Sequence, residues 1–289
     1  MKTFVKLIMT VVAVVFILSF FSKTYAAEYD GYQYDYFNWA QVEITGYSGT
    51  SDNLVIPSEI GGHRVTRIAI RAFFKNISLT SVVIPDSVTS IGYCAFSNCS
   101  SLTSITIPDS VTSIAESAFS GCSSLTSISI PDSVTSIGRY AFSGCSGLTS
   151  TTISDNLTRI SDGTFSGCGS LTSIIIPDSV TSIGVSAFSG CGSLTSVTFP
   201  NNLTSVESDA FFDCTSLTKV SITDLNVWCN ISFGNNCSNP LFFSHKLFLD
   251  NKEINELVIP DSVTSIGSNA FYGCSSLTSI TIPDSVTSI

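Results

Sequence analysis

A phenylalanine recurs every 23 residues along most of this chain, and a leucine follows six positions after each member of the unbroken series. A fixed period between about 20 and 50 residues is typical of solenoids, propellers and other repeat arrays. A propeller blade needs about 40 residues and four strands, more than this unit provides. The period therefore predicts one elongated solenoid domain. The phenylalanine series is Phe73, Phe96, Phe119, Phe142, Phe165, Phe188 and Phe211, and it resumes at Phe271 after an interruption.

Each unit carries eight apolar positions, with strand-like alternation before its proline. Six of the eight are large, and their burial contributes on the order of 12 kcal/mol. Ordering the unit costs roughly 1.5 kcal/mol per residue, so a single unit cannot fold alone. Stacking units about 4.8 Å apart pairs the short strands into a parallel sheet and closes the apolar interior. In one unit the apolar positions are Leu102, Ile105, Ile107, Val111, Ile114, Ala118, Phe119 and Cys122.

The unit L-x-x-I-x-I-P-x-x-V-x-x-I-x-x-x-A-F-x-x-C resembles the repeats of the BspA-like leucine-rich-repeat family of bacterial surface proteins. The resemblance implies a leucine-rich-repeat solenoid: a β-rich right-handed superhelix with a parallel sheet on its concave face and short strands or 3-10 turns on its convex face. Residues 43–66 look like the opening repeat of that family. We therefore assign residues 27–50 to an N-terminal cap region and 51–289 to the solenoid.

The last repeat is incomplete at Ile289. Open strand edges invite pairing with other strands. We therefore expect edge-to-edge self-association of the chain at its C-terminal coil.

Residues 1–26 combine Lys2 and Lys6 with an apolar run from Leu7 to Phe21 and end at Ala26, as in a cleavable signal peptide. A run of about 15 apolar residues is shorter than the ~20 needed to cross a bilayer, although an uncleaved anchor helix is the alternative. Cleavage removes three of the 12 basic residues and none of the 22 acidic ones, which shifts the formal net charge from −10 to −13. Such a surface repels phosphate backbones and argues against a nucleic-acid partner. We expect a secreted or cell-surface protein with no further transmembrane span.

One coil is predicted to be enlarged, because Leu217 and Ile254 occupy equivalent positions but lie 37 residues apart instead of 23. The irregular coil covers about 218–253, and Asp250-Asn251 between apolar segments predicts a hairpin turn. Side chains that break the repeat are the candidates for ligand contact, since the invariant positions serve the scaffold. The alternative is a private hydrophobic cluster that holds the extra loop down. The candidate contacts are Trp228, Phe233, Phe242, Phe243 and His245.

Nine of the ten cysteines fall into two groups, a recurring series that ends with Cys274 and a pair in the enlarged coil. Most recur once per unit, from Cys99 to Cys214, and predict a buried column of small apolar side chains, with inter-coil disulfides as the alternative. Cys229 and Cys237 lie in the enlarged coil, where a flexible intervening run would let them form a disulfide. No pair has the spacing of a metal site, and we expect neither a metal nor a cofactor.

Two polar rows also follow the period. Aspartates after the strands, as at Asp86 and Asp109, are expected to cap their own turns, with loose divalent-cation binding as the alternative. Outward serines and threonines, as at Ser104 and Thr106, predict a solvated sheet face, with binding of ice or a repetitive polymer as the alternative.

No catalytic motif is present in the sequence, and only two histidines are available for acid–base chemistry. We therefore expect a binding protein and not an enzyme. The resemblance implies cell-surface attachment and binding of host matrix or plasma proteins, so we predict an adhesin-type module for an extracellular protein or glycan. The alternative is a structural spacer or display scaffold for an anchor or another domain.

Overall fold

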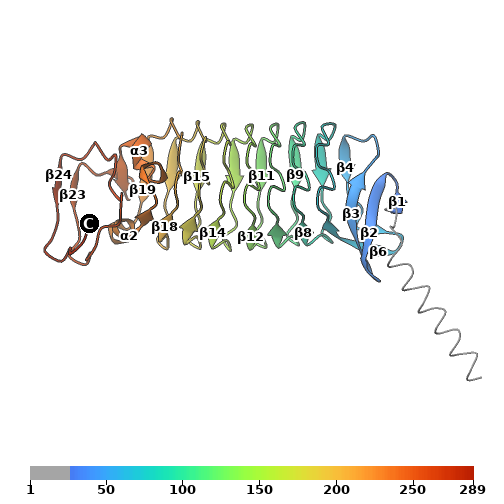
Figure 1. Ribbon diagram of the computed structural model, residues 1–289, viewed down its shortest axis with the longest axis horizontal. Helices are drawn as coiled ribbons and strands as arrows, with labels where there is room; N and C mark the ends of the chain where they lie inside the picture. Colours follow the sequence, from blue (N-terminus) through green and yellow to red (C-terminus); the bar gives the residue numbers. More distant parts are fainter. Residues whose placement is uncertain (1–26) are drawn as a thin grey trace, which may run out of the picture.

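The computed structural model describes residues 27–289, and it shows an elongated stack of coils that runs from the N-terminal strands to the C-terminal coil (Figure 1). The expected solenoid with a period of about 23 residues is confirmed. The predicted signal peptide, residues 1–26, lies outside the described residues. Within 27–289, none of the helices has the length and apolar character needed to span a bilayer.

Two columns of short parallel strands run along the stack. In strands such as β9 and β11, outward hydroxyls alternate with an inward isoleucine, so one face packs into the core and the other meets solvent. In regular coils, partners are 23 residues apart, as in Ser113↔Ser136 and Ser173↔Ser196. The first column contains β3 (Gln41–Tyr47), β6 (His63–Ile68), β8 (Ser90–Ile91), β10 (Ser113–Ile114), β12 (Ser136–Ile137), β14 (Arg159–Ile160), β16 (Ser182–Ile183), β18 (Ser205–Val206) and β20 (Ser232–Phe233). The second contains β4 (Asn53–Val55), β7 (Ser81–Val83), β9 (Ser104–Thr106), β11 (Ser127–Ser129), β13 (Ser150–Thr152), β15 (Ser173–Ile175), β17 (Ser196–Thr198), β19 (Lys219–Ile222) and β21 (Leu247–Leu249).

Turns that carry the phenylalanines close the third side of each coil. The backbone N–H of Phe96 donates to the carbonyl of Ala118 in the next coil at 2.7 Å, and the same bond recurs from coil to coil. The rings from Phe73 to Phe211 are buried and stack with centroids 4.9–5.6 Å apart. Such offset stacks stabilise each coil against both neighbours.

The recurring cysteines form the predicted buried column. Each thiol donates to the carbonyl of a phenylalanine 26 residues earlier, at 3.1–3.3 Å from Cys99 to Cys214. All ten cysteines are free, so the alternative of inter-coil disulfides is not realised. Burial raises the pKa of these thiols, to about 12 for Cys99 and Cys214. The column therefore contains neutral hydrogen-bonding thiols.

An antiparallel meander covers the N-terminal end of the stack. It consists of β1 (Ala27–Tyr29), β2 (Tyr32–Asn38) and β3, and β3 then pairs in parallel with β6. The Tyr47 ring lies 6.5 Å from that of Phe73, the first member of the phenylalanine stack. The short strand β5 (Glu59–Ile60) forms a hairpin with β6 through two glycines with positive φ.

The sequence suggested that the 14 extra residues enlarge a single coil, but the structure divides them between a longer coil and a hairpin. Val220 pairs with Leu247, 27 positions on, and the chain then makes an antiparallel hairpin between β21 and β22 (Lys252–Glu253). The hairpin prediction is confirmed, with φ of 48° at Asp250 and 65° at Asn251. The stack then continues with β23 (Glu256–Val258) and β24 (Ser279–Thr281). Helices α2 (Leu225–Asn230) and α3 (Leu241–Ser244) and the 3-10 turn η1 (Asn236–Ser238) complete this irregular segment.

Candidate ligand-binding site

Two of the predicted contact residues in the irregular segment are buried. Trp228 and Phe233 are 1% and 2% exposed, and their ring centroids lie 5.2 Å apart. Trp228 Nε1 donates to the carbonyl of Ala270 in the following coil at 2.9 Å. Because neither ring has free surface, the prediction that they contact an external ligand is wrong, and the alternative of an internal hydrophobic cluster describes them.

The other predicted contacts lie against the next coil. Phe242 and Phe243 are half-buried, and the Phe242 ring stacks on Tyr272 at 5.9 Å. His245 is exposed, but its Nδ1 lies 2.9 Å from the carbonyl of Gly273. These side chains attach the irregular segment to the coil that follows it, although parts of all three remain accessible.

The predicted disulfide between Cys229 and Cys237 is absent, because both thiols are free. The backbone ties the two residues to opposite neighbours in the stack. The Cys237 carbonyl accepts from Phe211 N–H in the preceding coil at 3.1 Å, whereas the Cys229 carbonyl accepts from Gly267 N–H in the following coil at 2.7 Å. The expected pairing is therefore wrong.

A buried amide that the sequence analysis did not single out completes the inner contacts of this segment. Asn239 is fully buried, and its Nδ2 donates to the carbonyls of Asn269 and Ala270 at 2.7 and 2.9 Å. In regular coils the carbonyl equivalent to that of Ala270 accepts a backbone N–H, as Ala118 does from Phe96. Side chains thus replace the backbone donors where the coil spacing changes.

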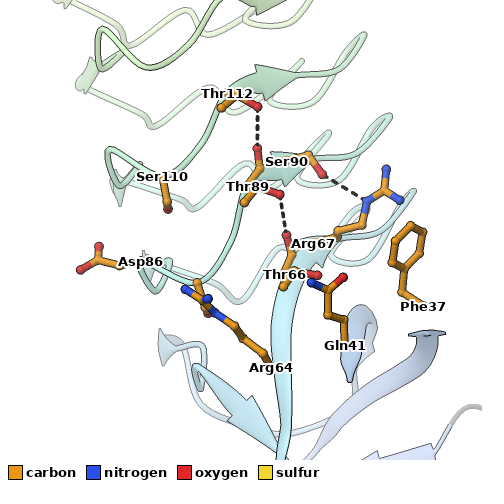
Figure 2. A pocket seen from close by; sticks show the side chains of 11 residues that line it. Phe37, Gln41, Arg64, Thr66, Arg67, Asp86, Thr89, Ser90, Ser110 and Thr112 are labelled. Atoms are coloured by element: carbon orange, nitrogen blue, oxygen red, sulfur yellow. Dashed lines mark hydrogen bonds between the residues drawn. The ribbon is translucent and has the colours of Figure 1, made fainter. Parts of the chain in front are cut away.

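A groove at the opposite end of the stack is lined mainly by polar and charged side chains. It has a volume of about 440 Å³ and opens over β3, β6, β8 and β10 beside the β2–β3 turn (Figure 2). We call it the N-terminal groove. Its lining consists of Phe37, Gln41, Arg64, Thr66, Arg67, Asp86, Ser87, Thr89, Ser90, Ser110 and Thr112.

A β-bulge places both arginines on this face. Residues 64 and 67 are separated by an odd number of positions and would point to opposite faces of a regular strand. The register of β6 against β3 shifts between Val65 and Arg67, which leaves Thr66 as the extra residue. As a result Arg64 and Arg67 both line the groove, while Val65 and Ile68 are both buried in the core.

The Arg67 side chain is held in place from two sides. Its Nε donates to Ser90 Oγ at 3.3 Å, and its guanidinium carbon lies 4.5 Å from the centroid of the Phe37 ring. Phe37 itself stands at a second register shift, in β2 between Tyr36 and Asn38. Among residues 27–289, the ion pairs involve neither Arg64 nor Arg67. Two guanidinium groups therefore face the groove with their charge uncompensated by a direct partner.

One aromatic ring, that of Phe37, lines the groove, and its sequence neighbours Tyr36 and Trp39 on the cap are also exposed. Tyr36 is 59% exposed, Phe37 51% and Trp39 88%, and Trp39 lies in the turn that joins Phe37 to Gln41. Exposed apolar side chains that cluster beside polar groups mark interaction sites more often than apolar side chains scattered singly over a surface. The sequence analysis assigned these residues only to the cap.

The outward hydroxyl face forms a second groove of about 410 Å³ along β9, β11 and β13. Its lining combines serines and threonines, such as Ser127 and Thr152, with isoleucines, and it contains no charged side chain. Two members of the aspartate row bond to the next coil instead of capping their own turn: Asp132 Oδ1 accepts from Asp155 N–H, and Asp178 Oδ1 accepts from Asn201 N–H. Across residues 27–289, no cluster of three or more His, Cys, Asp or Glu side chains is arranged to hold a metal ion.

Comparison with known proteins agrees with this architecture. The family described as BspA type leucine rich repeat region matches residues 66–191, 158–240 and 242–289, in six copies. The chain belongs to the BspA-type leucine-rich-repeat family. Proteins with this repeat are typically cell-surface or secreted binding scaffolds without enzymatic activity.

Two solved structures of bacterial proteins resemble this BspA-type chain over most of its length. A T. pallidum leucine rich repeat protein is 30% identical, with a TM-score of 0.52, and the match covers 72% of this chain and 85% of that one. A leucine rich cell surface protein of Faecalibacterium prausnitzii is 28% identical, with a TM-score of 0.51, and the match covers 92% and 90% of the two chains. Among curated proteins, none matches this chain significantly.

Proposed function

We propose that this BspA-type chain is a secreted or cell-surface adhesin-type protein that binds an extracellular protein or glycan through its N-terminal end. The observation that carries the proposal is the N-terminal groove, where two arginines without ion-pair partners adjoin exposed aromatic rings. Aromatic and arginine side chains are the residues most enriched at binding hot spots. A stack of coils locked by buried phenylalanines holds these groups in fixed positions, so little conformational entropy is lost on binding.

The second candidate function is a structural spacer or display scaffold. It is favoured by the repetitive surface of the regular coils, in which serines and threonines face solvent from β9 to β17, with Ile175 of β15 as the exception. A spacer requires length and stiffness but no particular ligand.

The two functions differ in whether the folded chain has a saturable ligand. The experiment measures binding of the purified full chain to a panel of matrix proteins, plasma proteins and glycans. An adhesin binds at least one member saturably, and an R64Q/R67Q variant weakens that binding. Absence of binding by chain with native circular dichroism would favour the spacer.

A further inference from the structure

We propose that the N-terminal groove binds a carboxylate or sulfate group of an acidic glycan, an inference that rests on the proposed function and specifies its ligand. The volume of about 440 Å³ lies within the range of about 300–1,000 Å³ that small-ligand sites occupy. Guanidinium groups recognise carboxylate and sulfate-like oxygens with paired N–H donors, so the two arginines define the charge of the ligand.

The charge of the groove is opposite to that of the chain as a whole. The chain has 22 acidic and 12 basic residues, yet the groove is lined by two arginines and by one carboxylate, that of Asp86. Figure 2 shows the Asp86 carboxylate turned away from both guanidinium groups. By contrast, Arg139 and Arg159, farther along the stack, both pair with Asp162, at 3.2 and 3.1 Å.

Two buried hydroxyls in the groove have no partner. Thr66 Oγ1 and Ser87 Oγ are among five buried side-chain oxygens of residues 27–289 that lack a hydrogen bond, and both residues are 94% buried and line this groove. At three later positions the equivalent serine donates to the preceding coil, as Ser110 does to the carbonyl of Val88 at 2.6 Å. Ser87 lacks this bond, as does the equivalent Ser179. A buried hydroxyl without a partner is costly, so the fold leaves two unsatisfied polar groups beneath the floor of the groove.

The surroundings of the arginines favour a sugar over an acidic peptide. Gln41, Thr89 and Ser90 line the groove and offer amide and hydroxyl groups that match sugar hydroxyls. The aromatic ring in the lining is that of Phe37, and Trp39, two residues on in the adjoining turn, offers an almost fully exposed ring for the C–H face of a pyranose. A peptide carboxylate requires only the arginines. The combination of guanidinium, hydroxyl and aromatic groups is therefore that of an acidic saccharide site.

The test is a calorimetric titration of the full chain with four probes of similar length. They are a heparin hexasaccharide, which carries both sulfate and carboxylate, a hexagalacturonate, which carries carboxylate alone, the neutral maltohexaose, and hexaglutamate. We expect at least one of the two acidic saccharides to bind at least about tenfold more tightly than maltohexaose and hexaglutamate. Which of the two binds identifies the anion.

Variants locate the binding. Replacing either arginine removes charge-assisted hydrogen bonds, so R64Q and R67Q are each expected to weaken binding about tenfold or more. W39A lowers the affinity for the saccharide, and D86N raises it. The matched control is R139Q/R159Q, which removes the same charge outside the groove and is expected to leave the affinity unchanged at 0.15 M salt.

Equal binding of maltohexaose, equal binding of hexaglutamate, absence of binding by every probe, or equal weakening in R139Q/R159Q would each overturn the inference. The arginines are exposed or half-buried, so circular dichroism and melting of R64Q/R67Q are expected to match those of the wild type. If this variant keeps full affinity for a ligand from the panel, the groove inference fails while the proposed binding function stands.

Discussion

The column of buried thiols makes the folded chain less stable at alkaline pH. Cys99 and Cys214 are fully buried, and burial raises the pKa of each thiol from 9.0 to about 12. In the folded chain these thiols stay protonated up to a pH near 12, whereas in the unfolded chain they lose their protons above about 9. Between these values the unfolded state binds fewer protons, so the free energy of unfolding falls as the pH rises.

The size of the effect follows from these two pKa values. At pH 10, a thiol with a pKa of 9.0 in the unfolded chain is mostly ionised, while one with a pKa of about 12 in the folded chain is not. Each such thiol then lowers the free energy of unfolding by about 1.4 kcal/mol relative to pH 7. For Cys99 and Cys214 together the loss is about 3 kcal/mol.

The assay is urea unfolding at pH 7 and pH 10, in the presence of a reductant, for the wild type and a C99A/C214A variant. At pH 7 the variant is less stable, by about 1 kcal/mol for each buried sulfur atom removed. At pH 10 the difference in free energy of unfolding between the two chains narrows or reverses. The reason is that the variant lacks the two thiols whose ionisation costs the wild type about 3 kcal/mol. Tyr32, whose pKa burial raises to about 12, is present in both chains and cancels in the comparison.

C237A provides the matched control, since Cys237 is only half-buried and lies outside the column. Its pH dependence is expected to stay close to that of the wild type. Parallel losses of stability in the wild type and in C99A/C214A between pH 7 and pH 10 would refute the reasoning, because the thiols would then contribute nothing to the proton linkage.

Three further predictions concern the core and the irregular segment. F142A removes a fully buried ring stacked on both neighbours and is expected to cost about 3–5 kcal/mol in urea unfolding, well above the cost of F242A at a half-buried position; equal costs would contradict the stacking argument. N239A removes side-chain hydrogen bonds to Leu241, Asn269 and Ala270 and is expected to cost about 2–4 kcal/mol, with faster hydrogen exchange confined to residues 225–289; uniform exchange along the stack would contradict it. Brief treatment of the native chain with iodoacetamide is expected to alkylate Cys237 first, because the other nine cysteines are buried; peptide mass spectrometry reads the site, and early labelling of Cys145 would refute this.

The regular part of the fold was predictable because the repeat period sets the strand register. Once Phe96 and Phe119 occupy equivalent positions, strand partners must differ by the same 23 residues, as Ser127↔Ser150 does. The inward position of the cysteines follows from the same argument. One period, visible in the sequence, thus determines pairing, core composition and the direction of growth.

The groove was not predictable, because it depends on a bulge. The spacing of Arg64 and Arg67 places them on opposite faces of any regular strand, and only the pairing of β6 with β3 shifts Thr66 out of register. That pairing involves the cap, which has no repeat to fix it. A cluster of basic residues in an otherwise acidic chain was the available signal, since Arg64, Arg67, Arg71 and Lys75 fall within 12 positions.

The irregular segment was misjudged for a different reason. Unusual aromatic residues in a loop suggest contact with a partner, but here the partner lies within the chain. Trp228 and Asn239 donate to the carbonyl of Ala270, which is 42 and 31 residues away in the sequence. The altered coil spacing leaves this carbonyl without its usual backbone donor. That requirement cannot be recognised from the sequence, because it depends on where the following coil lies in three dimensions.

Specific recognition requires a surface that occurs once, and a periodic stack repeats most of its surface in every coil. Within residues 27–289 the period is broken mainly at two places, the cap with the first coil and the irregular segment. The second uses Trp228, Phe233 and Asn239 to rejoin the stack, so its distinctive groups are largely occupied by internal contacts. At the first, Arg64 and Arg67 line the groove without ion-pair partners, and the Trp39 side chain is exposed. The need to close the apolar core at its N-terminal end therefore also creates the surface best suited to bind a ligand.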